Sequence, residues 1–190
     1  MNKVKMIVAA GVLLTLGGIY YFRRTKKNGV RNMINGSYFT IEELCRSTTA
    51  TAQGIDNTPS ETAKKNMQRL ITTILDPIRE RYGGPITVSS GYRSEKLNKA
   101  VGGVSNSYHM KGLAADLVGA HRSDEERKAI FRAAFAVGGY DQLILEQTKD
   151  GKTKWVHVGL REESPRKQLF AIVKGGDKTA ITESNWERYA

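Results

Sequence analysis

The chain has 190 residues and a formal net charge of +11, with 30 Lys and Arg residues against 19 Asp and Glu residues. Residues 1–31 hold seven of the basic side chains and no acidic one, so residues 32–190 carry a net charge of only +4. A mildly basic domain of this length gives little support to nucleic-acid binding, and it is long enough for one core of ordinary size.

The first predicted element is an uncharged apolar run, residues 6–22, which lies between Lys5 and Arg23. As an α-helix it would extend about 26 Å, close to the thickness of a thin bilayer. A cleaved signal peptide is the alternative, but no good small-residue cleavage site follows the run. We therefore expect residues 1–27 to be an N-terminal membrane anchor or signal segment, and we favour an uncleaved single-pass helix.

A polar, glycine-bearing linker (28–37) follows, then a folded domain (38–175) and a C-terminal tail (176–190). The capping box at Thr40–Glu43 predicts a short helix. Its continuation includes Cys45, the only cysteine, whose apolar helical setting indicates a small packed residue and not a nucleophile.

A longer helix is predicted from Thr58–Glu61, with Pro59 at its first helical position. Pro77 should kink this helix, and Gly83–Gly84 should end it. Apolar residues at three- and four-residue steps give it one core-facing stripe: Met67, Leu70, Ile71, Ile74, Leu75 and Ile78.

A further helix is capped by Ser123–Glu126 and stopped by Gly138–Gly139. The alternating or apolar runs predict five strands, at 85–89, 113–118, 140–148, 153–159 and 167–173. Helices before and between antiparallel strands indicate an α+β fold, in which a small antiparallel sheet packs against helices.

The turn signal Asp150–Gly151 predicts the register of the last hairpin, through a two-residue type I′ turn. That turn places Glu146 opposite Trp155 and Ile144 opposite His157. Glu146 and His157 then share one face of the sheet as diagonal neighbours, roughly 7–8 Å apart. A four-residue loop would keep this parity, whereas a three-residue loop would reverse it.

The pattern S-x-H-x-x-G-x-A-x-D at residues 107–116 offers metal ligands. Two imidazoles, His109 and His157, and one carboxylate, Asp116, suit a catalytic zinc that keeps its fourth tetrahedral position open. Gly112 lets the chain turn back between His109 and Asp116, so both side chains can face one ion. The expected stoichiometry is one Zn²⁺ per chain.

Five motifs occur in order: S-G-Y-R (90–93), L-N (97–98), V-G-G (101–103), the run at 107–116 and W-V-H (155–157). Together they resemble the M15 family of zinc D-Ala-D-Ala carboxypeptidases and peptidoglycan endopeptidases, most of all its phage and prophage branch. The resemblance covers roughly residues 38–160. It implies a zinc metallopeptidase of this α+β fold that acts on the peptide stem of peptidoglycan.

The resemblance also implies a carboxylate base shortly before the last histidine, sometimes three residues before it. That nearer position is Lys154 here, which leaves Glu146 as the candidate base and Asp141 as the second choice. A surface glutamate in a hairpin is the ordinary alternative for Glu146.

Arg93, in S-G-Y-R, matches the family arginine that binds substrate and stabilises the developing oxyanion, although a surface arginine is the ordinary alternative. Ser107 either hydrogen-bonds substrate or braces the turn. His121 is expected to be an exposed or outer histidine and not a fourth ligand.

Two forms of hydrolysis stay open, removal of a terminal residue and cleavage within the stem, and the phage-like motifs favour a lytic endopeptidase. The alternative function is a non-catalytic zinc-containing module that binds cell wall or a receptor. The presence of both Glu146 and Arg93 argues against that module, because a purely structural zinc usually closes its fourth position with a protein ligand. Neither a nucleic-acid partner nor an obligate protein partner is expected.

The expected location follows from two conflicting signals. Lys3, Lys5 and the α-amine precede the apolar run and four bases follow it, so the positive-inside rule would keep the domain in the cytoplasm by a narrow margin. Mature peptidoglycan lies outside the cytoplasmic membrane, and short basic N-terminal tails of signal anchors are commonly retained inside. We expect the zinc domain on the cell-wall side, either anchored through residues 6–22 or released.

Overall fold

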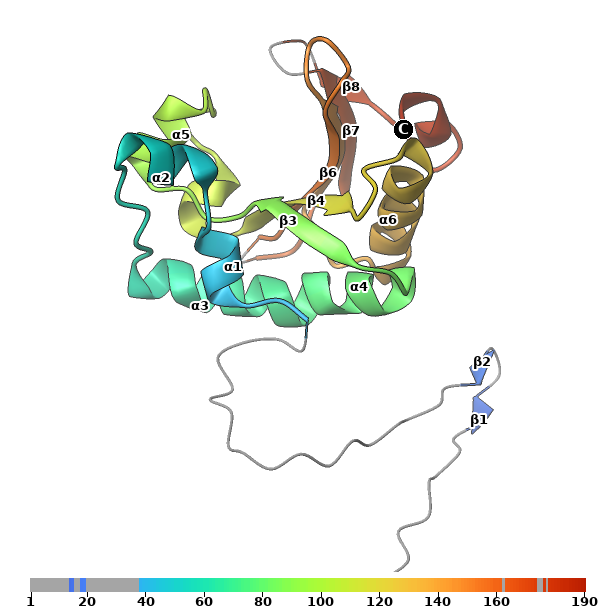
Figure 1. Ribbon diagram of the computed structural model, residues 1–190. Helices are drawn as coiled ribbons and strands as arrows, with labels where there is room; N and C mark the ends of the chain where they lie inside the picture. The colour runs from blue at the N-terminus through green and yellow to red at the C-terminus, as the bar shows by residue number, and fades with distance from the viewer. Residues whose placement is uncertain (1–13, 16–17, 20–37, 162, 174–175, 177) are drawn as a thin grey trace, which may run out of the picture. The chain divides into compact units, whose positions relative to one another are not determined.

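The computed structural model divides the chain into two units, Met1–Asn32 and Met33–Ala190 (Figure 1). It describes residues 14–15, 18–19, 38–161, 163–173, 176 and 178–190. The linker predicted at 28–37 and most of the apolar run lie outside these described residues.

In the first unit, β1 (Leu14–Thr15) and β2 (Gly18–Ile19) form a short antiparallel pair. These four residues lie in the run for which we expected a membrane helix, so the structure differs from that expectation at these positions. Among the described residues, no helix has both the length and the apolar character needed to cross a bilayer.

The second unit contains six α-helices and three helical segments of other kinds within the described residues. The α-helices are α1 (Ile41–Cys45), α2 (Thr48–Gln53), α3 (Glu61–Leu70), α4 (Asp76–Tyr82), α5 (Glu95–Ala100) and α6 (Asp124–Val137). The others are the π-helical segment η1 (Ile71–Leu75) and the 3₁₀ segments η2 (Tyr108–Lys111) and η3 (Trp186–Tyr189).

One six-stranded sheet has the order β3-β4-β6-β5-β7-β8. Its strands are β3 (Ile86–Ser90), β4 (Ala114–Gly119), β5 (Gln142–Gln147), β6 (Lys154–Gly159), β7 (Gln168–Val173) and β8 (Lys178–Ala180). The five predicted strands are present, and the α+β class is confirmed. Every pair is antiparallel except β5–β7, which is parallel. A meander would pair β7 with β6, but β4 already occupies that edge, so β7 pairs with the free edge of β5.

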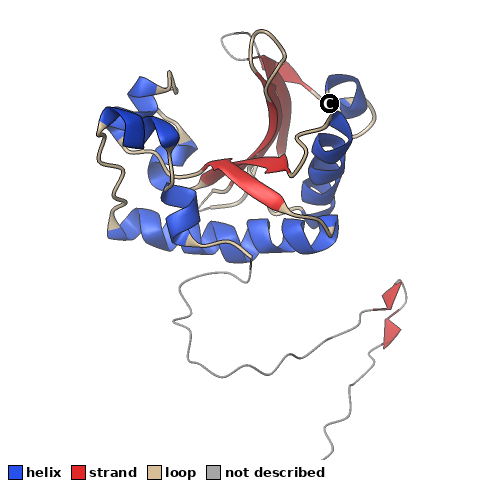
Figure 2. Cartoon of the chain, in the orientation of Figure 1, coloured by secondary structure: helices blue, strands red, loops and turns tan. Residues whose placement is uncertain are grey.

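The hydrophobic core lies between one face of this sheet and the helices α3, η1, α4 and α6 (Figure 2). All six residues of the predicted stripe are buried there. Leu117, Leu145 and Val156 contribute from the sheet. The other face of the sheet is therefore free to carry polar side chains.

The α3–η1–α4 helix adapts to Pro77 through a π-helical turn. Pro77 has no N–H to donate, and the preceding turn widens so that the Asp76 N–H donates to the Ile71 carbonyl, five residues back. Gly83 ends the helix in the left-handed conformation (φ 76°), as predicted. The start differs by two residues from our prediction, because the Ser60 hydroxyl caps the helix by accepting from Ala63 N.

The β5–β6 register is confirmed, because Glu146 pairs with Trp155 and Ile144 with His157. The predicted two-residue turn is wrong. Thr148 N donates to Thr153 O (2.8 Å), which leaves the four-residue loop 149–152. Both loops preserve the same parity, which is why the pairing is correct although the turn is not.

Residues 178–190 of the predicted C-terminal tail (176–190) contribute to the same sheet and core. They add β8 to the sheet, and they bury Ile181 and Trp186 in the core, where the Trp186 ring lies 4.7 Å from that of Phe131. Their polar spacing gave no periodic signal from which this packing could be predicted.

Candidate metal centre

The three side chains predicted to be metal ligands, His109, Asp116 and His157, meet on the face of the sheet opposite the core. The atoms His109 Nε2 and Asp116 Oδ1 are 3.3 Å apart, Asp116 Oδ1 and His157 Nδ1 are 2.9 Å apart, and the two imidazole nitrogens are 3.3 Å apart. All three side chains are buried. The result is a nearly equilateral triangle of two nitrogens and one oxygen.

This triangle fits a zinc ion. Zinc bonds of about 2.0–2.1 Å in a tetrahedral site separate neighbouring ligand atoms by roughly 3.3 Å. The side lengths in the structure are close to that value, and the donor set of two imidazoles and a carboxylate is one that zinc accepts. Within the described residues, this is the one group of three or more possible ligands that converge in this way.

Sheet register places two of the three ligands. Asp116 on β4 and His157 on β6 are directly paired residues of neighbouring strands, so their side chains leave the same face side by side. His109 lies on η2, which ends at Gly112 (φ 70°). A Cβ at Gly112 would lie 2.5 Å from the Ala63 carbonyl oxygen, so glycine is required here for space as well as for its positive φ.

A second layer of contacts orients these ligands. His109 Nδ1 donates to the Gly91 carbonyl at 2.7 Å, which fixes the tautomer that leaves the Nε2 lone pair free. Gly91 is itself tightly packed, because a Cβ there would lie 2.3 Å from the Leu44 carbonyl oxygen. Arg93 Nη2 donates to Asp116 Oδ2 at 2.9 Å, and Arg93 Nε donates to Ser90 Oγ at 2.8 Å.

The electrostatics of the triad favour the protonation state that metal ligation needs for His109 and Asp116, but not for His157. Burial lowers the pKa of His109 and so favours neutral imidazole. Burial would raise the pKa of Asp116, but the charges and hydrogen bonds of His109 and His157 outweigh burial and lower it, so this carboxylate is ionised. Burial would also lower the pKa of His157, but its hydrogen bond and charge interaction with Asp116 leave that pKa raised.

Glu146 lies on the same face as the triad, two residues along β5 from Ile144, which pairs with His157. Burial raises its pKa above the ordinary glutamate value, and the charge of His157 only partly offsets this. A carboxylate near the metal triad with a raised pKa has the properties expected of a general base.

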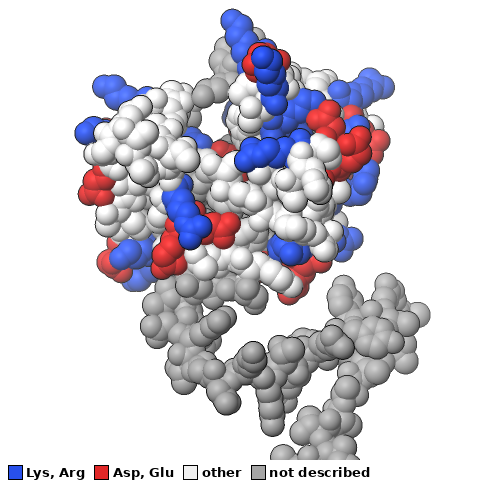
Figure 3. Space-filling view, in the orientation of Figure 1, with Lys and Arg blue, Asp and Glu red and all other residues white. Residues whose placement is uncertain are grey.

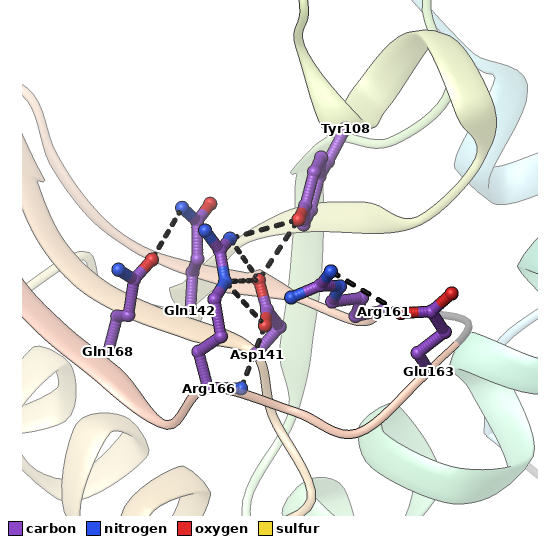
Figure 4. A network of polar contacts seen from close by, with 7 residues as sticks. All are labelled: Tyr108, Asp141, Gln142, Arg161, Glu163, Arg166 and Gln168. Carbon is purple, nitrogen blue, oxygen red and sulfur yellow. Dashed lines mark hydrogen bonds and ion pairs between the residues drawn. The ribbon is translucent and has the colours of Figure 1, made fainter.

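The second-choice base, Asp141, is held by partners outside the triad. Asp141 is fully buried and bound by Tyr108 and Arg166, whose hydroxyl and guanidinium contact its carboxylate (Figure 4). Burial would raise the pKa of Asp141, but these hydrogen bonds outweigh burial and lower it to about 2. Such a carboxylate is a structural anion and a poor proton acceptor.

Tyr108 and Arg166 were not singled out from the sequence. The Tyr108 hydroxyl donates to Asp141 Oδ2 (3.0 Å), and Asp141 N donates to the Gly159 carbonyl (2.7 Å). This network connects η2, and thus His109, to the ends of β5 and β6. Nothing in the spacing of residues this far apart could have indicated the contact.

The remaining candidates take ordinary positions. Arg93 is largely buried, and its guanidinium contacts Asp116 and Ser90. Ser107 is buried, and its backbone carbonyl accepts from Met110 N at 3.2 Å, whereas its hydroxyl does not cap η2. His121 is exposed, as expected. Lys154 binds Asp124 at 2.8 Å.

A buried His-Asp-His triad with a neighbouring carboxylate, in an α+β domain, is the arrangement expected of a zinc metallopeptidase. Residues 37–159, more than half of the chain, match the family model described as Peptidase M15, and the chain belongs to that family. The zinc D-Ala-D-Ala carboxypeptidase of Streptomyces albus G is 43% identical over 81 residues. That match covers 42% of this chain and 30% of the relative, so the two proteins share only part of their lengths.

Proposed function

We propose that the protein hydrolyses the peptide stems of bacterial peptidoglycan as a zinc-dependent peptidase. The observation that carries the proposal is the zinc-sized triangle of His109, Asp116 and His157 with Glu146 on the same face. Family membership and the name of the Streptomyces relative support the substrate class.

The chain's own residues have separate tasks in this reaction. A zinc ion held by the triad would supply Lewis-acid polarisation of the scissile carbonyl and activation of water. Glu146 accepts the proton of the attacking water and returns it to the leaving amine, a role that its raised pKa suits. Arg93 holds Asp116 in position through Oδ2, and its remaining guanidinium donors are available to substrate oxygens.

The experiment is digestion of purified peptidoglycan by the zinc-loaded chain, with mass analysis of the soluble products. Loss of one terminal residue would identify a carboxypeptidase, and longer fragments would identify the stem endopeptidase that a phage lysis enzyme would need. The matched control is the double variant His109→Ala, His157→Ala. Binding to the wall without any change in fragment mass would overturn the proposal and support the non-catalytic wall-binding module.

A further inference from the structure

The sheet face that carries the triad continues well beyond it. Asp116, His157, Ile144 and Phe170 stand side by side across β4, β6, β5 and β7. Residues directly paired across a sheet project from the same face, so Phe170 shares the face of the metal ligands. β7 and β8 follow residue 159, where the family match ends.

A second row lies two residues along the strands from the first. It runs across β6, β5, β7 and β8, and its members are Trp155, Glu146, Ile172 and Lys178. Because side chains alternate between faces, this row and the first share one face. The candidate base therefore lies in line with a lysine at the far side of the sheet.

The apolar residues of this face are not part of the core. Phe170 and Ile172 are half-buried and outside the core cluster, whereas Ala171 between them is buried in it. Figure 3 shows this side of the molecule hollowed between α2 and α5 on one side and β6–β8 on the other. An apolar strip that continues from a hydrolytic site is suited to contact a peptide in extended form.

Lys178 supplies a charge at the end of this strip. Its Nζ lies 4.6 Å from the centroid of the Phe170 ring, so the ammonium group leans back over the face. Lys178 is exposed, and no carboxylate of the described residues lies within ion-pair distance of it. Its charge also reaches the candidate base. Burial raises the pKa of Glu146, and the positive charge of Lys178 is one of the charges that partly offset this rise.

Strand spacing sets the scale of this arrangement. The Lys178 ammonium lies over Phe170 on β7, and β6 and β7 are two strand separations apart, about 10 Å, which an extended peptide covers with roughly three residues. We propose that β7 and β8 form a subsite in which Phe170 and Ile172 contact the substrate peptide and Lys178 binds a carboxylate about three residues from the scissile bond. This inference rests on the proposed function and narrows its substrate to acidic peptides that extend beyond one terminal residue.

The test compares soluble stem peptides released from purified peptidoglycan with the same peptides after their carboxylates are converted to amides. Binding to the zinc-loaded full chain is measured by titration calorimetry, and KM is measured where cleavage occurs. Lys178→Glu should raise Kd for the acidic peptides by on the order of fivefold, because an exposed charge pair contributes up to about 1 kcal/mol. The variant should not weaken binding of the amidated peptides, and Lys178→Arg should restore wild-type affinity.

The matched control is Lys65→Glu, which makes the same charge change at an exposed residue of α3. This helix lies on the other side of the sheet. It should leave Kd for both peptide sets unchanged. Two results would overturn the subsite. One is an equal Kd of Lys178→Glu and the wild type for the acidic peptides, and the other is no binding of those peptides by the wild type. Binding that depends on Lys178 without any hydrolysis would instead overturn the proposed function and leave the subsite standing.

Discussion

At the scale of single residues, each member of the triad supplies one ligand atom. The two remaining ligands are not enough to hold the zinc ion. Replacing His109 or His157 by Ala removes one of three ligand atoms, and Asp116→Ala removes the hard oxygen ligand. We expect each variant to lose zinc and activity. Metal analysis after dialysis against a weak chelator measures this, and full zinc occupancy in a double histidine variant would refute the ligand assignment.

Glu146 has a separate task from the triad, so its replacement should separate turnover from metal binding. Glu146→Gln keeps the shape of the side chain but cannot accept a proton from water. We expect unchanged zinc content with a fall in kcat of roughly 10²–10⁴-fold, the usual cost of removing a general base.

The comparison for this variant is Glu187→Gln, at an exposed carboxylate on η3 that pairs with Arg132. It should have wild-type kcat. A near-normal kcat for Glu146→Gln would assign the base role to another group.

At the scale of elements, the Asp141–Arg166 pair connects β5 to the segment that leads into β7. Asp141 has a pKa of about 2 in the folded state, lower than about 3.9 in an unfolded chain. The pair therefore contributes stability above pH 4, and this contribution is lost as the pH falls from about 4 to 2.

Asp141→Asn should accordingly reduce the free energy of unfolding at pH 7 by roughly 1–2 kcal/mol, a value discounted because the Arg166 side chain is 42% exposed. The difference from wild type should shrink near pH 2. Denaturant unfolding at both pH values measures this. Asp150→Asn, in the exposed β5–β6 loop, is the control, and an equal effect of both variants would contradict the role of the pair.

Local elements could be predicted where short-range chemistry determines them. The capping box at Ser123 and Glu126 forms in full, and the hydrophobic stripe of the long helix is buried. The start of that helix was misplaced because Thr58 and Ser60 both offer a capping hydroxyl, and sequence alone does not rank them. The parallel β5–β7 pair could not be predicted, because it depends on which edge β4 has already taken.

The candidate metal ligands and the candidate base could be predicted from the sequence. The contacts that hold these residues in place could not. The motif spacing predicts that His109 and Asp116 face one ion, and the hairpin parity predicts that Glu146 and His157 share a face. The contact of Arg93 with Asp116 depends on the β3–β4 register, which contains a bulge between Val88 and Ser90. A one-residue irregularity of that kind has no signature in the sequence.

At the scale of the whole molecule, the apolar run 6–22 still carries the expectation of membrane association. We propose that it holds the zinc domain on the cell-wall side of the cytoplasmic membrane, with a short basic N-terminal tail inside. A reporter fused after Ala190 should be active only outside the cytoplasm. A reporter active only inside would refute this topology and would also weaken the peptidoglycan assignment.

The position of β7 has a consequence for shortened forms of this protein. All three ligands and Glu146 precede residue 160, so a chain cut there would still contain every group of the proposed chemistry. It would, however, leave β5 with a bare edge, where six residues of backbone now paired with β7 would face solvent. Such an edge is a template for strands of other molecules. Chains that end at the family boundary should therefore aggregate through β5, whatever their metal content.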